Sequence, residues 1–237
     1  LAYGMEVYEA FVARMIRHPH RPRALLVPVN LRSFSIVWDV RPEFQYQLLK
    51  LRLRWGDLLA YGLIRPLTSF GPYRPSPASA AEFRRTPVVR RSRTMGTVEE
   101  VLEGRGPSKE FGPMARQFIL TYEYELELDH RKIRALERIV ERCGNAGIVP
   151  LVYVTPIDVE TGTKEAGPRF REQVDRNVGL LKAALASRGV DLLDLSSGVD
   201  AGGFDWTTSP NEHLNERGRR FVADALAKLV RSAALRR

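Results

Sequence analysis

Cysteine and histidine are scarce in this sequence, and each scarcity excludes a class of site. Cys143 is the one cysteine among 237 residues, so neither an internal disulfide framework nor a thiolate metal site is available. The four histidines are His18, His20, His130 and His213. His18 and His20 form a His-x-His pair with no carboxylate or cysteine nearby in the sequence to complete a coordination sphere. We therefore expect neither a metal ion nor another cofactor.

Long apolar runs and nucleotide motifs are also missing. No apolar run approaches the roughly 18 residues that cross a bilayer, and no signal peptide is visible. Neither a glycine-rich phosphate loop nor a dinucleotide fingerprint is present. The chain begins with Leu1 rather than methionine and soon enters a helical pattern, so we expect a trimmed edge and leave a leader or anchor upstream open.

Acidic residues are outnumbered, which gives a formal net charge of +9 from 37 basic and 28 acidic side chains. Part of the excess gathers in one proline- and serine-bearing segment at Arg84, Arg85, Arg90, Arg91 and Arg93. Such a cluster is a candidate contact for an anionic surface, and its alternative is a solvated, mobile connection. Aromatic residues are not interleaved with it, so we expect no specific nucleic-acid binding.

What the sequence does contain is an alternation of helical and strand patterns. Helices are predicted over 5–17, 41–67, 113–143, 169–188 and 216–235, and strands over 24–29, 148–154 and 190–195, with a Pro/Arg-rich insertion at about 68–112. This order predicts an α/β fold, a single three-layer doubly wound domain over 1–237 with a mainly parallel central sheet. The basic helix over 41–67 is expected to pack on the sheet rather than on a membrane.

Polar residues follow each predicted strand. Asn30 comes after the first, Thr155 and Asp158 after the second, and Asp194 at the end of the third. In open α/β sheets ligands bind at the carboxyl ends of the strands, so we expect these groups along one edge. Asn30 has two interpretations, a turn cap or a ligand-binding amide, and the two aspartates fit turn positions better than catalytic ones.

His213 has the most site-like setting of the histidines. It lies in the stretch Asn211-Glu212-His213-Leu214-Asn215-Glu216-Arg217-Gly218, just before an amphipathic C-terminal helix. An imidazole held by a short loop at a helix start can act as a general base near neutral pH. The alternative is a helix-start residue bonded to backbone, with Asn211 as the N-terminal cap.

The block His213-Leu214-Asn215-Glu216-Arg217-Gly218 resembles the His-Leu-Asn-x-x-Gly block of the SGNH (GDSL-like) hydrolases, a family mostly of esterases, acyltransferases and deacetylases. Asn30 stands where that family places its oxyanion asparagine, and Gly4 where its oxyanion glycine is expected. The resemblance implies a flavodoxin-like SGNH architecture and an ester hydrolase or acyltransferase acting on an O-acylated carbohydrate or small ester. It also implies His213 as base, with the Asn30 amide and the Gly4 N–H as oxyanion donors. Gly4 also fits a simple helix-entry glycine.

Two departures from the family pattern keep a second interpretation open. The Gly-Asp-Ser nucleophile block has no counterpart, which indicates N-terminal truncation, and Ser33 and Ser35 lie in the wrong block to replace it. The family's acid partner, three residues before the histidine, is Pro210 here. Asp205 is our preferred partner of His213, with Glu212 and Asp194 as alternatives.

The competing interpretations are therefore three. The first is a truncated SGNH-type enzyme, and the second is a non-catalytic SGNH-fold binding or scaffold domain. A weaker third is a polyanion-binding protein. The resemblance also implies export or membrane tethering, as for many members of the family.

Overall fold

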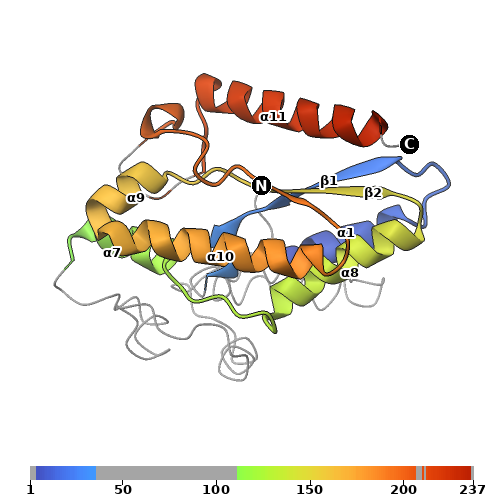
Figure 1. Cartoon of the computed structure of the whole chain (residues 1–237), viewed down its shortest axis with the longest axis horizontal. Helices are drawn as coiled ribbons and strands as arrows, with labels where there is room; N and C mark the ends of the chain where they lie inside the picture. Colours follow the sequence, from blue (N-terminus) through green and yellow to red (C-terminus); the bar gives the residue numbers. More distant parts are fainter. Residues whose placement is uncertain (1–3, 36–110, 207–209, 211, 236–237) are drawn as a thin grey trace, which may run out of the picture.

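The computed structural model describes residues 4–35, 111–206, 210 and 212–235 (Figure 1). The predicted helix over 41–67 and the arginine cluster lie outside the described residues. So does the predicted insertion at 68–112, except for its last two positions.

Within the described residues, the centre of the fold is a parallel sheet of three strands in the order β1-β2-β3. They are β1 (Ala24–Val29), β2 (Val149–Val154) and β3 (Leu192–Asp194). In the register of the sheet Val29 pairs with Val154, which pairs with Asp194 on its other side. The apolar runs predicted these strands because both faces of a parallel sheet are covered. The predicted α/β class with a parallel sheet is confirmed.

Helices lie on both faces of the sheet (Figure 1). The described helices are α1 (Met5–Met15), α7 (Pro113–Tyr122), α8 (Arg131–Asn145), α9 (Val159–Ala166), α10 (Pro168–Ala186) and α11 (Glu216–Leu235). Figure 1 shows α11 above the sheet, and α8 and α10 below it. The core includes Val29, Val154 and a helical stripe on α8 that contains Leu136 and Ile139, all fully buried. None of the described helices has the length and apolar character needed to cross a membrane.

The prediction of one helix over 113–143 is wrong. Helix α7 ends at Tyr122 and α8 begins at Arg131, with an extended segment between them. The segment is held by Asn177 of α10, whose Oδ1 accepts a hydrogen bond from the Leu126 N–H at 3.1 Å and whose Nδ2 donates to the Tyr124 carbonyl at 2.8 Å. These side-chain bonds replace the helical bonds that the backbone gives up.

The connection from β2 to β3 contains α9, a helix that was not predicted. The Asp158 carboxylate caps it by accepting a hydrogen bond from the Thr161 N–H at 3.0 Å. Gly167, at φ 90°, separates α9 from α10, and Pro168 occupies the first turn of α10. The sequence Gly167-Pro168 thus ends one helix and begins the next.

Candidate functional site

The carboxyl edge of the sheet brings together the polar residues expected there. Parallel pairing places Asn30, Thr155 and Asp194 at the same ends of β1, β2 and β3. The Thr155 N–H donates to the carbonyl of Val29 at 3.0 Å, which sets Thr155 beside the start of the Asn30 turn. This is the edge at which open α/β sheets bind ligands.

Asn30 caps the 3₁₀ turn η1 (Leu31–Phe34). Its Oδ1 accepts a hydrogen bond from the Arg32 N–H at 2.9 Å, and its carbonyl accepts from the N–H and the hydroxyl of Ser33 at 3.0 and 2.7 Å. The cap uses only the oxygen of the amide, and the Nδ2 makes no hydrogen bond to the described residues. The two interpretations of Asn30, cap and donor, are therefore compatible.

Gly4 precedes α1 in an extended conformation, with φ −62° and ψ 155°, and its carbonyl accepts from the Val7 N–H at 2.9 Å. It is thus a helix-entry residue. A Cβ built on Gly4 would lie 3.8 Å from the Lys132 side chain. The ammonium of Lys132, a buried side chain, donates to the carbonyl of Ser33 in η1. Lys132 thereby connects the surroundings of Gly4 with the turn that Asn30 caps.

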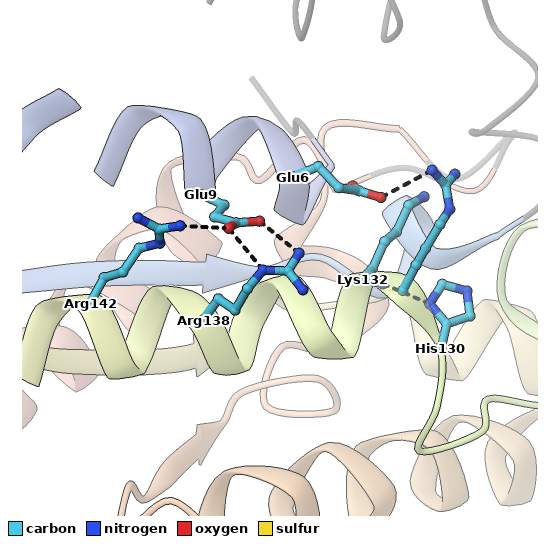
Figure 2. A network of polar contacts seen from close by, with 7 residues as sticks. Glu6, Glu9, His130, Lys132, Arg138 and Arg142 are labelled. Carbon is cyan, nitrogen blue, oxygen red and sulfur yellow. Dashed lines mark hydrogen bonds and ion pairs between the residues drawn. The ribbon is translucent and has the colours of Figure 1, made fainter. Parts of the chain in front are cut away.

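Acidic residues of α1 and basic residues of α8 hold this part together (Figure 2). Glu9 accepts two hydrogen bonds from Arg138, both at 2.8 Å, and Glu6 pairs with Arg131 at 3.2 Å. The hydrogen bonds to Glu9 raise the pKa of Arg138 above its ordinary value. These pairs fix the helix that begins after Gly4 against α8.

His213 lies on an exposed loop whose main chain is pinned on both sides. Its carbonyl accepts from the Asp205 N–H at 2.8 Å, next to an antiparallel bridge between Phe204 and Leu214. The imidazole packs on Trp206, with ring centroids 4.8 Å apart and planes at 34°. An exposed imidazole on a fixed main chain can transfer protons without moving the loop.

Asn215 and Gly218 of the His213 block have structural roles. The Oδ1 of Asn215 accepts from the N–H groups of Arg217 and Gly218 at 3.0 and 3.2 Å, so Asn215 is the cap of α11. The cap predicted at Asn211 therefore belongs to Asn215, and Asn211 lies outside the described residues. A Cβ on Gly218 would lie 2.3 Å from the Gly203 carbonyl, so only glycine fits there.

The acid partner of His213 stays a prediction. The Asp205 carboxylate is exposed and makes no hydrogen bond or ion pair with the described residues, while Glu212 accepts from Tyr122. Asp194 accepts from the Ser196 N–H and hydroxyl at 3.0 and 2.6 Å, and from Lys182 at 3.1 Å. Burial raises the pKa of Asp194, but these hydrogen bonds outweigh it and leave the pKa below its ordinary value.

Two tyrosines at the end of α7, which the sequence did not reveal, join the two halves of the candidate site. The Tyr124 hydroxyl donates to the Leu31 carbonyl at 2.6 Å, one residue after Asn30. The Tyr122 hydroxyl donates to the Glu212 carboxylate at 2.7 Å, one residue before His213. Burial first, and then the charge of Glu212, raises the pKa of Tyr122 far above its ordinary value, so the phenol remains a donor. The two tyrosines therefore bond the Asn30 turn and the His213 loop to neighbouring positions, one at the end of α7 and one just after it.

Three buried polar atoms in the loops after β1 and β2 lack a hydrogen-bond partner among the described residues. They are the Oγ of Ser35, the Oγ1 of Thr155 and the Oδ2 of Asp158. Buried polar atoms are nearly always satisfied, so these atoms are open to a ligand or to chain groups outside the described residues.

Among the described residues no group of His, Cys, Asp and Glu side chains could hold a metal ion. A surface pocket of about 350 Å³, lined by residues of α7 and α9 and by Ala201, contains neither Asn30 nor His213.

Comparisons of the chain with protein-family models, with curated proteins and with solved structures find no match.

Proposed function

We propose that the carboxyl edge of this sheet is an acyl-transfer site of the SGNH type on a flavodoxin-like frame. In this proposal His213 is the general base, and the side-chain amide of Asn30 and the backbone N–H of Gly4 donate to the oxyanion. The substrate class is an O-acylated carbohydrate or a small ester, as the resemblance of the His213 block implies.

The observation that carries the proposal is the connection of the two predicted halves through Tyr122, the last residue of α7, and Tyr124, which lies just after it. The Asn30 turn is bonded to Tyr124 and the His213 loop to Tyr122, two residues away. The charge of Arg32, in the same turn as Asn30, also acts on the Tyr122 phenol and opposes the rise in its pKa. A turn and a loop that are separate in sequence therefore face one short segment.

The chemistry of the two groups suits acyl transfer. Attack on an ester carbonyl places negative charge on its oxygen, and preorganised N–H donors aimed at that charge lower the barrier. Asn30 fits because the cap at Oδ1 fixes the amide plane and leaves the Nδ2 donor unused. His213 would accept the proton of the attacking hydroxyl and return it to the departing alcohol.

The proposal assigns the nucleophile to a serine N-terminal to Gly4 in the natural chain, in the block that the resemblance implies. Ser33 does not suit the role because its hydroxyl donates to the Asn30 carbonyl, and the Ser35 hydroxyl is buried without a hydrogen-bond partner among the described residues. A non-catalytic binding domain is the second candidate. It is favoured because, among the described residues, the Asp205 carboxylate makes no hydrogen bond to His213, and because Pro210 stands at the position of the family's acid.

The test uses the full natural chain with a fluorophosphonate probe and with p-nitrophenyl acetate. We expect one serine adduct by intact mass, and His213→Ala should lower kcat/KM by about 10²–10⁴-fold. His18→Ala, which removes an exposed histidine of another loop, is the matched control and should leave both readouts unchanged. A natural chain with no adduct and no hydrolysis would favour the binding domain.

Asn30→Asp tests the oxyanion donor separately from the cap. The aspartate keeps the acceptor oxygen for the Arg32 N–H but loses the amide donor, so kcat should fall about 10²–10³-fold with the fold retained. Circular dichroism and thermal unfolding check the fold. Wild-type kcat in Asn30→Asp would remove Asn30 from the mechanism.

A further inference from the structure

The loop before α11 is held by hydrogen bonds at two points, one before His213 in the chain and one at and after it. On one side the main chain of 213–215 is bonded to 203–205, through Asp205 N–H to His213 O at 2.8 Å and Asn215 N–H to Gly203 O at 3.1 Å. On the other side the Glu212 carboxylate accepts from the Tyr122 hydroxyl at 2.7 Å. The first tether fixes the backbone after His213, and the second fixes the residue before it.

The second tether rests on a single hydrogen bond. In the part of the chain that the structure describes, Tyr122 is the one hydrogen-bond partner of the Glu212 carboxylate. The phenol is itself held rigidly, since Tyr122 is fully buried and its ring packs edge-on against Phe170 with centroids 6.2 Å apart. Phe118 also packs edge-on against Phe170, with ring centroids 5.5 Å apart. The phenol is thus a buried, closely packed donor, and its position defines where Glu212 lies.

We propose that Tyr122 is a positioning residue, which holds Glu212 and thereby sets the place of the His213 imidazole at the carboxyl edge. This inference rests on the proposed function. Among the described residues, Tyr122 makes its hydrogen bond to Glu212 and none to the imidazole. Its effect passes through Glu212 to the adjoining residue, so loss of the hydroxyl displaces the base without removing it. A displacement of about 1 Å from productive geometry can cost on the order of 100-fold in rate.

The experiment measures kcat and KM for p-nitrophenyl acetate hydrolysis by the full natural chain. Tyr122→Phe should lower kcat about 10- to 100-fold with little change in KM, because the substrate contacts remain while the base is misplaced. Glu212→Ala should give the same loss. Glu212→Gln keeps an acceptor oxygen for the Tyr122 hydroxyl and should retain most of the activity.

The double variant Tyr122→Phe/Glu212→Ala should be no slower than either single variant, because both changes break the same contact. Tyr153→Phe is the matched control. It removes a half-buried phenol of β2 that makes no hydrogen bond with the described residues, and it should leave kcat unchanged. Amide hydrogen exchange of 212–215 should accelerate in Tyr122→Phe and not in Tyr153→Phe.

The outcomes separate this inference from the function on which it rests. Hydrolysis that depends on His213, together with wild-type kcat in Tyr122→Phe, would overturn the inference alone. Additive losses in the double variant, or a rise in KM with kcat unchanged, would overturn it as well. A natural chain without hydrolysis, or hydrolysis that survives His213→Ala, would overturn the proposed function and with it the positioning role.

Discussion

The α1–α8 interface and the end of α7 both join distant segments through polar side chains, but they differ in burial. Between α1 and α8 the contacts are ion pairs that face solvent, and Arg138 and Arg142 are 46% and 43% exposed in their side chains (Figure 2). At the end of α7 and in the extended segment after it, the donors are the buried side chains of Tyr122 and Tyr124 and of Asn177 on α10. Exposed ion pairs contribute little because water and salt screen them, whereas a buried group without its partner keeps its full desolvation cost. The buried hydrogen bonds around the end of α7 should therefore contribute more to the free energy of unfolding than the ion pairs between α1 and α8.

The largest effect should come from Asn177, which satisfies two backbone groups of the extended segment. Asn177→Leu has a similar volume but leaves the Leu126 N–H and the Tyr124 carbonyl without partners. At about 1–3 kcal/mol for each buried group left unsatisfied, the free energy of unfolding should fall by about 3 kcal/mol.

Gln173→Leu is the control for Asn177→Leu. Gln173 is also buried on α10, but its side-chain bond is to Asn177 alone, at 3.1 Å, and no backbone group depends on it. Its cost should stay below about 1.5 kcal/mol, the net worth of one ordinary hydrogen bond. Urea unfolding of both variants gives the comparison. Equal costs would show that the extended segment does not need Asn177.

A smaller loss is expected for Tyr124→Phe. The change removes the donor to the Leu31 carbonyl and leaves the ring in place, so the unfolding free energy should fall by about 1–2 kcal/mol. In the proposed enzyme the same change should lower kcat through the Asn30 turn. A loss no larger than that of Tyr153→Phe would break the contrast between the bonded and unbonded phenols.

The ion pairs between α1 and α8 should contribute still less to the free energy of unfolding. Glu9 and Arg138 form a two-bond pair, and a double-mutant cycle with Glu9→Gln and Arg138→Met should yield a coupling of about 0.5–1 kcal/mol. The coupling should shrink as the salt concentration rises from about 0.05 M to about 0.5 M, because salt screens exposed charges. A coupling above about 2 kcal/mol, insensitive to salt, would contradict the contrast between the two regions.

How far the sequence predicted the fold depends on how local each signal is. Continuous apolar runs identified the strands at 24–29 and 148–154, and amphipathic spacing identified the final helix. The break between α7 and α8 was missed because Asn177, some fifty residues away, supplies the bonds that stabilise it. The alternation Tyr124-Glu125-Leu126-Glu127 is a period of two that could have indicated an extended segment.

The candidate site also has parts that the sequence predicted and parts that depend on distant contacts. Parallel topology alone predicted that Asn30, Thr155 and Asp194 share one edge. The resemblance pointed to His213, but the capping role of Asn215 and the close approach at Gly218 are visible only in the folded structure. The Tyr122–Glu212 bond spans 90 residues and follows no sequence period, so no pattern could reveal it.

The smallest effect on the free energy of unfolding should come from Asp194. Its carboxylate is bonded to Ser196 and Lys182, but the residue remains exposed. Because the folded-state pKa of Asp194 is lowered, its contribution is present above the unfolded value of about 3.9 and is lost as pH falls through the folded pKa. Asp194→Asn should therefore lower the unfolding free energy at pH 7 by less than about 1 kcal/mol, and the difference from wild type should shrink below about pH 4. Unfolding free energies measured from pH 7 to pH 3 test this. A difference that grows on acidification would mean that the ionised carboxylate destabilises the folded state, which would contradict a stabilising role for its bonds to Ser196 and Lys182.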